Sequence, residues 1–212
     1  ACYDTPEGDP RWRTTQYAPV QWGVSQLGEA ARRAMRALPL SLRLAKVPDV
    51  LFVHASPRSD RDSLSAYTPA DRLHDMFGYV PEKTIVRAHN HTCQVRLWEG
   101  RQIVTAGSVG LPLDGNPTAQ YLLLEHNGRG WRFEHQSVPY DVDAALRRFD
   151  ETGYMAAVGP MAHLFRREVE TAAHHMVPFV RAYAGWQQEG LSLESAVERF
   201  LTPIDGDATR EE

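Results

Sequence analysis

The chain has 212 residues, of which 42% are hydrophobic and 24% are charged, and its formal net charge at pH 7 is −4. This balance excludes a general nucleic-acid-binding surface, because phosphate neutralisation needs an excess of Lys and Arg. No stretch approaches the roughly 18–20 consecutive apolar residues of a transmembrane helix, so no membrane partner is expected. Two cysteines, Cys2 and Cys93, cannot make a disulfide framework, which favours a cytoplasmic location.

The first quarter of the chain changes from an irregular to a helical pattern. Residues 1–25 show no sustained periodicity and are predicted to form an irregular surface segment. Residues 26–38 place Leu and Ala on one stripe, which predicts an amphipathic helix that ends before Pro39.

The middle of the chain has the pattern of an α/β body. Short apolar runs predict buried strands at 50–53 and 84–87, with a helix over 68–77 between them. Alternating runs that flank turn residues predict two β-hairpins, formed by 94–98 with 102–105 and by 121–124 with 131–133.

The strand patterns stop after Tyr140, and a helical annex is predicted for the rest of the chain. Its expected helices are a short one, a long one that Pro178 kinks or splits, and a last one before a frayed polar tail. They cover residues 141–152, 161–188 and 192–201. The domain boundaries are therefore placed at 1–140 and 141–212.

One apolar face of the annex has two interpretations. Its residues recur at helical spacing and are Leu164, Phe165, Ala172, Met176 and Val180. Packing within the annex is the favoured interpretation, and a homo-oligomer interface or a lid over a pocket is the alternative.

Three histidines, His54, His89 and His91, stand just past the ends of predicted buried strands. Binding and catalytic groups collect at such strand ends. In an extended segment, His89 and His91 would face the same side, about 6.5–7 Å apart, so each could ligate one member of a metal pair about 3.5–4 Å apart. Taken alone, a His-x-His pattern is more often two surface loop histidines.

Three segments together resemble the calcineurin-like metallophosphoesterase family, and within it the small bacterial phosphodiesterase branch. Its Val-His-Gly motif is matched by Val53-His54-Ala55, which Ser-Pro follows. Its Gly-His-Thr-His motif is matched by Ala88-His89-Asn90-His91, and its Asn-Pro-Gly-Ser-Val-Gly motif by Thr105-Ala106-Gly107-Ser108-Val109-Gly110. The resemblance covers roughly residues 15–140.

The resemblance implies a β-sandwich flanked by helices and a two-metal hydrolase for small phosphoesters, most of all a phosphodiester or a nucleotide. His54 and His89 would ligate one divalent ion and His91 the other, the ions being drawn from Mn, Fe, Zn, Ni and Mg. A bridging hydroxide would attack phosphorus. Ser108 and Gly107 would line the substrate pocket. No catalytic acid or base is identified.

The chain departs from the family pattern in two ways. Ala55 and Ala88 stand where the family has glycine, and Asn90 stands where it has threonine. The family's earlier motifs, Asp-x-His, Gly-Asp and Gly-Asn-His or Gly-Asn-Tyr, have no counterpart, so the fold is expected to be incomplete at its N-terminus.

Three explanations fit this gap. The sequence is a part of a longer protein, which is favoured, or the missing half is a separate chain, or the protein is a non-catalytic binding or regulatory homologue. A protein-serine/threonine phosphatase, which shares the motifs, is a further alternative.

Overall fold

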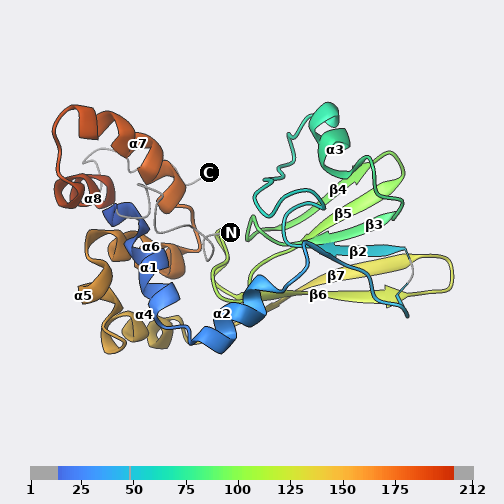
Figure 1. Cartoon of the computed structure of the whole chain (residues 1–212), viewed down its shortest axis with the longest axis horizontal. Coiled ribbons are helices and arrows are strands. Elements are labelled where there is room, and N and C mark those ends of the chain that lie inside the picture. Colours follow the sequence, from blue (N-terminus) through green and yellow to red (C-terminus); the bar gives the residue numbers. More distant parts are fainter. Residues whose placement is uncertain (1–13, 48, 203–212) are drawn as a thin grey trace. The chain divides into compact units, whose positions relative to one another are not determined.

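The computed structural model describes residues 14–47 and 49–202, and their contacts divide into two compact units (Figure 1). A sheet unit holds residues 29–141, and a helical unit holds residues 14–28 together with 142–202. Residues 14–28 therefore group with the helices, whereas the sequence assigned them to the first domain. No helix among the described residues is long and apolar enough to cross a membrane.

The sheet unit is built on five strands in the order β1-β2-β3-β5-β4 (Figure 1). They are β1 (Ser41–Leu42), β2 (Val50–Val53), β3 (Thr84–Arg87), β4 (Cys93–Trp98) and β5 (Arg101–Ala106). β2, β3 and β5 are parallel, and β1 and β4 pair antiparallel at the two edges. Both predicted buried strands and the first predicted hairpin are confirmed. The carboxyl ends of the three parallel strands share one edge of the sheet.

The second predicted hairpin is also confirmed, and it is longer than predicted. β6 (Ala119–His126) and β7 (Trp131–Val138) form a separate two-stranded antiparallel sheet. In the connecting loop, the side-chain oxygen of Asn127 accepts hydrogen bonds from the backbone N–H groups of Arg129 and Gly130. The Nε2 atom of His135 lies 2.8 Å from the carbonyl oxygen of Thr105, which joins β7 to β5.

The core of the sheet unit lies between the sheet and helix α3 (Ala70–Phe77). Leu73, Met76 and Phe77 are buried on one face of this helix, as residues spaced by three and four positions must be. They pack with Leu51, Leu64, Val80, Ile85, Trp98 and Ile103. The α3 helix confirms the prediction for 68–77, and Pro69 stands at its N-cap.

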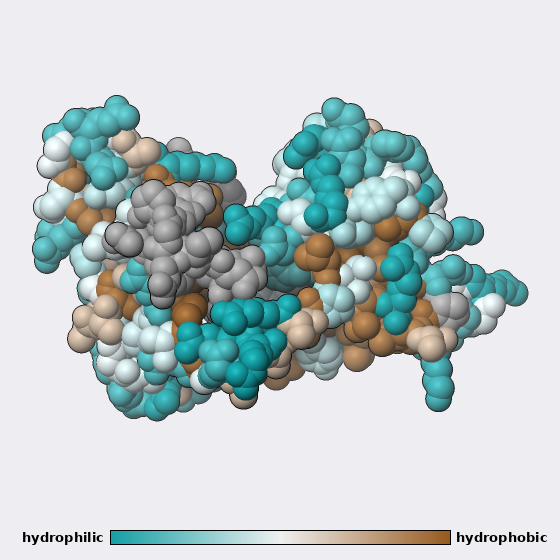
Figure 2. Space-filling model, viewed as in Figure 1, coloured by the Kyte–Doolittle hydropathy of each residue, from teal (hydrophilic) through white to brown (hydrophobic). Residues whose placement is uncertain are grey.

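Apolar side chains also remain on the surface of the sheet unit, where Figure 2 shows hydrophobic residues among hydrophilic ones. Leu38, Leu40, Leu42 and Leu44 lie in and beside the short edge strand β1 and are exposed, as are most of their neighbours in the sequence.

The N-terminal part of the chain corrects two predictions. Residues 15–25 are helical rather than irregular, as η3 (Thr15–Tyr17) and α1 (Ala18–Ser25), while residues 1–13 lie outside the described part. Pro19 occupies the first turn of α1, where its missing N–H costs nothing. The helix predicted over 26–38 is α2 (Glu29–Arg36) and begins later.

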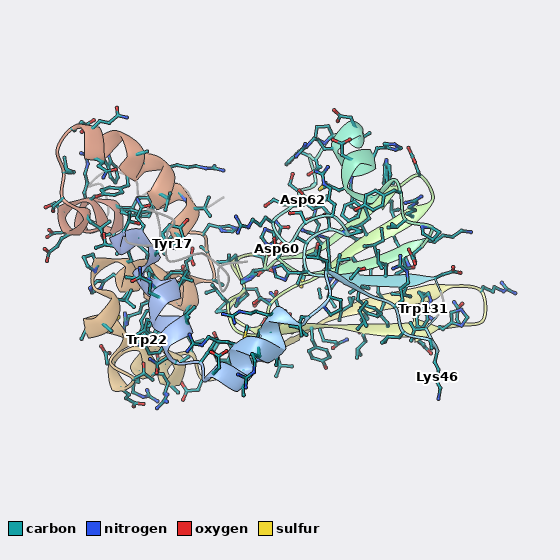
Figure 3. All side chains as sticks on the ribbon, viewed as in Figure 1. Tyr17, Trp22, Lys46, Asp60, Asp62 and Trp131 are labelled. Atoms are coloured by element: carbon teal, nitrogen blue, oxygen red, sulfur yellow. The ribbon has the colours of Figure 1, made fainter. Side chains whose placement is uncertain are left out.

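The helical unit contains α1, α4 (Val142–Glu151), α5 (Tyr154–Val158), α6 (Pro160–Thr171), α7 (Met176–Gln188) and α8 (Leu193–Leu201). The α4 and α8 helices confirm the predictions for 141–152 and 192–201. Trp22 of α1 packs edge-on against Tyr154 of α5, with 4.9 Å between the ring centroids, and Figure 3 labels this tryptophan. Leu164 and Ala172 are fully buried in this unit, whereas Val180 is exposed.

The long helix predicted over 161–188 is two helices, and the break lies before Pro178. Ala172 takes a left-handed conformation that ends α6. The buried Glu168 carboxylate then accepts hydrogen bonds from the backbone N–H groups of His175 and Met176, at 2.9 and 2.8 Å. Pro178 falls in the first turn of α7, where it neither removes a helical hydrogen bond nor kinks the helix. Cys2 and the predicted frayed tail from 203 onward lie outside the described residues.

Candidate functional site

The candidate site lies at the carboxyl edge of the parallel strands. His54 directly follows β2, and His89 comes two residues after β3, the parallel neighbour of β2. The backbone N–H of Ala88 donates to the carbonyl oxygen of His54 at 2.9 Å, so the strand pairing continues past both strand ends. This pairing carries the two histidines to the same place.

The imidazole rings of His54 and His89 are in edge-on contact. The Nδ1 atom of His89 lies 3.2 Å from the Nε2 atom of His54, and the ring planes are 78° apart. Two nitrogens that bind one tetrahedral zinc ion at about 2.0–2.1 Å are separated by about 3.3–3.4 Å. The separation therefore suits a hydrogen bond between the rings and also suits two ligands on one ion, so this donor pair fits a divalent metal.

The electrostatic surroundings keep both imidazoles neutral near pH 7. Burial is the main cause that lowers the pKa of His54 and of His89, and the positive charge of Arg87 lowers both further. Asp60, in the loop after β2 (Figure 3), acts in the opposite direction on both pKa values without reversing either shift. Neutral imidazole is the form that binds metal ions.

The segment that carries His89 and His91 is a turn, which corrects the expectation of an extended segment. Both histidines have positive φ values, 66° and 57°. The backbone N–H of Asn90 donates to the carbonyl oxygen of Ala88 at 2.8 Å, which closes a three-residue turn around His89. Left-handed backbone at a residue other than glycine is a sparsely populated conformation that the surrounding contacts must stabilise. In such a turn the i, i+2 rule for side chains does not hold.

His91 has a hydrogen-bond partner of its own, and it lies close enough to His54 and His89 to contribute to the lowered pKa of both. Its Nδ1 atom lies 2.7 Å from the carbonyl oxygen of Leu111. A carbonyl oxygen can only accept, so Nδ1 donates this hydrogen bond and Nε2 is the nitrogen left to bind a metal. Metal-bound histidines commonly have this arrangement. Among the described residues, however, no group of three or more His, Cys, Asp or Glu side chains is close enough to hold one ion.

Gly107 and Ser108 lie in the loop after β5, and Ser108 pairs with Gln120 of β6 through its backbone N–H and its carbonyl oxygen. The Ser108 hydroxyl accepts from the backbone N–H of Leu111 at 3.0 Å, so it supports the residue that fixes His91. Gly107 has a φ of 87°, and a Cβ there would lie 2.6 Å from Oε1 of Gln120. The predicted contact of both residues with substrate stays a prediction.

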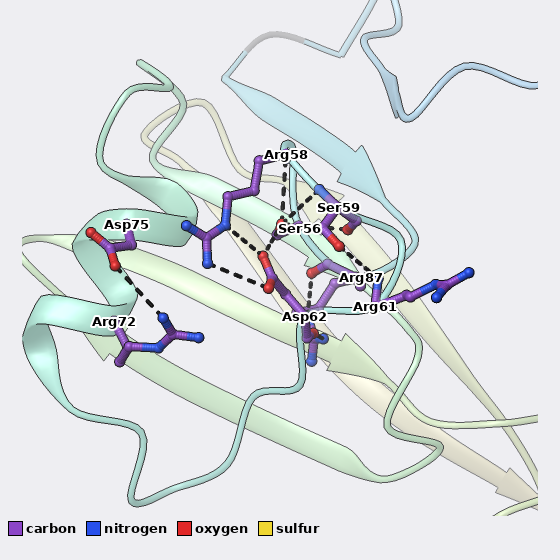
Figure 4. Close-up of polar contacts among 9 residues, drawn as sticks. Ser56, Arg58, Ser59, Arg61, Asp62, Arg72, Asp75 and Arg87 are labelled. Atoms are coloured by element: carbon purple, nitrogen blue, oxygen red, sulfur yellow. Dashed lines mark hydrogen bonds and ion pairs between the residues drawn. The ribbon is translucent and has the colours of Figure 1, made fainter. Parts of the chain in front are cut away.

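A partly buried polar network beside the histidines was not predicted from the sequence. Asp62 accepts hydrogen bonds from Oγ of Ser56 at 2.6 Å and from Nε of Arg58 at 2.8 Å, as Figure 4 shows. Arg87, which is 1% exposed, donates to the backbone oxygen of Asp62. The only sequence signal for this network is an arginine at the end of an otherwise apolar strand.

A cavity of about 790 Å³ opens at the opposite, amino edge of the strands. Its walls include Thr84 and Gln102, at the starts of β3 and β5, and Trp131 of β7, which Figure 3 labels. None of the three histidines lines this cavity. The candidate metal site therefore lies outside this cavity, at the carboxyl edge of the sheet.

No protein-family model and no curated protein matches the chain, but solved structures do. The chain is similar to the crystal structure of a metallophosphoesterase from Sphaerobacter thermophilus, with a TM-score of 0.53, 22% identity, and 76% of this chain and 72% of that chain covered. It is also similar to that of a hypothetical protein from Pyrococcus horikoshii OT3, with a TM-score of 0.56, 16% identity, and 75% and 67% covered. The mixed α/β fold of the metallophosphoesterases, expected from the sequence, is thereby confirmed.

Proposed function

We propose that the protein hydrolyses a phosphoester with the help of bound divalent metal. The observation that carries this proposal is the pair of imidazole nitrogens, 3.2 Å apart, at the carboxyl edge of a fold that a metallophosphoesterase structure shares. His54 and His89 bind one ion in this proposal. His91 presents Nε2 to a second ion, because Nδ1 is engaged by Leu111.

The donor chemistry narrows the choice of metal. Neutral imidazole suits Zn, Fe, Mn and Ni, whereas Mg prefers oxygen ligands. A bound divalent ion supplies positive charge to the phosphoryl oxygens and makes water more acidic. A catalytic zinc site commonly has three protein ligands and an open position, so water, substrate or groups outside the described residues complete the coordination in this proposal.

The substrate class is a small-molecule phosphodiester or nucleotide, processed in the cytoplasm by an enzyme of the bacterial phosphodiesterase branch. Support comes from the sequence segments that carry the resemblance, Val53-His54-Ala55, Ala88–His91 and Thr105–Gly110. Ser108 and Gly107 follow the strand next to β3, so the third segment reaches the same edge of the sheet as the histidines. A homo-oligomer formed through the helices of residues 142–202 is part of the proposal.

The experiment uses the metal-free full chain and bis(p-nitrophenyl) phosphate as the probe. Addition of Mn²⁺ is expected to start hydrolysis, and His89→Ala is expected to abolish it. His163→Ala is the matched control, because His163 is an exposed histidine on α6 of the helical unit. Full activity of the His89→Ala variant would refute the ligand assignment, and no activity of the wild type with Mn, Fe, Zn, Ni or Mg would refute hydrolysis of this probe.

A second candidate function is a non-catalytic binding or regulatory protein. One observation favours it: the described residues bring only two strong donors, His54 and His89, within reach of one ion. A protein of this kind would bind Zn²⁺ through the two histidines but would hydrolyse neither a phosphodiester nor a phosphomonoester. Titration calorimetry and turnover assays on the same preparation separate the two candidates.

A further inference from the structure

A single buried arginine contacts the loop after β2, the turn after β3 and the end of β5. Arg87 ends β3, and its Nε atom donates to the carbonyl oxygen of Ala55, next to His54, at 2.7 Å. Nη2 donates to the carbonyl oxygen of Asp62 at 2.7 Å, and Nη1 donates to Oγ1 of Thr105 on β5 at 3.2 Å. Two of these acceptors are backbone oxygens of the loop that follows His54.

The fourth contact of Arg87 is with the residue between the two histidines of the His-x-His motif. Nη1 donates to the side-chain oxygen of Asn90 at 2.7 Å. The same oxygen accepts from the backbone N–H of Leu64 at 3.1 Å. Asn90 thus ties the turn that holds His89 to the loop that begins at His54.

We infer that Arg87 and Asn90 are positioning residues for the metal site, because together they fix the turn at 88–91 against the loop at 55–64 and so hold His89 within reach of His54. The inference rests on the proposed function. Asn90 stands where the motif of the resembled family has threonine. The inference gives this asparagine a structural role. Neither residue is assigned a contact with substrate.

The chemistry of the guanidinium suits this role. Its N–H groups lie in a rigid plane, so the four acceptors must take fixed positions around it. Burial lowers the pKa of Arg87 to about 10, which leaves the group charged at neutral pH. A lysine ammonium could not reach the same set of acceptors in one plane.

The test compares four variants of the full chain. Asn90→Ala removes the oxygen that accepts from Arg87 and Leu64, and Asn90→Asp keeps it. Thr84→Val is the matched control, because Thr84 is buried and lies on β3, the strand that Arg87 ends. This variant loses the hydrogen bond from Gln102, which lies at the opposite edge of the sheet. Arg87→Lys is a fourth variant, expected to behave like Asn90→Ala if it folds.

The first measurement is titration of each metal-free variant with Zn²⁺. We expect Asn90→Ala to weaken binding about 10- to 100-fold, as loss of outer contacts to metal ligands does. Asn90→Asp should restore most of the affinity, and Thr84→Val should leave it unchanged. An unchanged affinity in Asn90→Ala, or an equal loss in Thr84→Val, would overturn the positioning role.

The second measurement needs no metal and is amide hydrogen exchange. Asn90→Ala should accelerate exchange at Leu64, whose N–H loses its acceptor, and at Ala88, whose N–H pairs with His54. Thr84→Val should change neither. If the wild type bound no Zn²⁺ while the exchange result held, the proposed function would fail and the positioning of the turn would stand. Unchanged exchange at both amides in Asn90→Ala would overturn the inference whatever the metal result.

Discussion

The Nδ1 atom of His89 lies 3.2 Å from the Nε2 atom of His54, although 35 residues separate the two histidines in the sequence. Parallel pairing of β2 with β3 brings them together, since each histidine follows the carboxyl end of its strand. The contact is local in space and remote in sequence. Binding through this pair should therefore depend on both residues at once.

Removal of either histidine should weaken metal binding by more than about 100-fold, because direct ligands contribute more than the outer contacts that cost 10- to 100-fold. Zn²⁺ titration of His54→Ala, His89→Ala and the double variant measures this. The double variant should lose little more than each single one, since both side chains serve one ion. Additive losses would mean that the two histidines bind separately.

The sequence predicted that His54 and His89 lie at one edge of the sheet, and the metal-binding role of all three histidines stays a prediction. Short apolar runs define β2 and β3, and parallel strands share an edge, so His54 and His89 had to lie near each other. The prediction for His91 assumed an extended backbone, and the left-handed turn at His89 and His91 makes that assumption wrong. Nothing in the periodicity of a sequence reports such a turn, because side-chain and backbone contacts from remote segments stabilise it.

Arg87 and Asn90 escaped the sequence analysis for the same reason. A charged residue in an apolar strand has no periodic signature, and three of the four acceptors of Arg87 are more than 15 residues away in the sequence. The helices show the opposite case, since α4 and α8 follow from local periodicity. The sequence also predicted a kink or a split at Pro178, and the chain breaks shortly before it. The cap that the buried Glu168 gives to α7 had no signal in the sequence.

Gly107→Ala should destabilise the sheet unit more than Gly115→Ala. Both glycines have positive φ values, 87° and 80°, so both variants suffer the left-handed penalty of about 1–2 kcal/mol. A Cβ at Gly107 also meets Oε1 of the buried Gln120 at 2.6 Å, whereas Gly115 has open space. The close contact should add about 1–3 kcal/mol to the loss.

Urea denaturation of the two glycine variants measures the difference in the free energy of unfolding. Zn²⁺ titration of the same variants reports whether the loop after β5 also supports His91. Equal destabilisation by Gly107→Ala and Gly115→Ala would show that Gln120 moves away without cost.

Acid should remove the stabilisation that Asp62 contributes. The hydrogen bond from Arg58 is the largest influence and, with that from Ser56, holds the pKa of Asp62 below its ordinary value. A lowered folded-state pKa means that the stabilisation is complete above the unfolded-state pKa, about 4, and is lost as the pH falls through the folded-state value. Asp62→Asn should lower the Tm at pH 7 and differ less from the wild type below about pH 4.

Thermal melts between pH 2 and pH 7 measure this dependence. Asp75→Asn is the control, because Asp75 forms an exposed ion pair with Arg72 on α3, at 3.8 Å, and such pairs contribute little. A constant difference between Asp62→Asn and the wild type across this range would contradict the assignment to Asp62.

Glu168→Ala should destabilise the helical unit by about 2–3 kcal/mol, because two partly buried backbone N–H groups lose their acceptor. These are the N–H groups of His175 and Met176, at the start of α7. Glu168→Gln keeps a side-chain oxygen for these N–H groups but loses the negative charge that stabilises a helix N-terminus. Its stability should therefore fall between that of the wild type and that of Glu168→Ala. Glu170→Ala, which removes an exposed ion pair with Arg167, should cost less than about 1 kcal/mol. Thermal denaturation of the four proteins gives the order, and a Glu168→Ala variant as stable as Glu170→Ala would show that the Glu168 carboxylate does not cap α7.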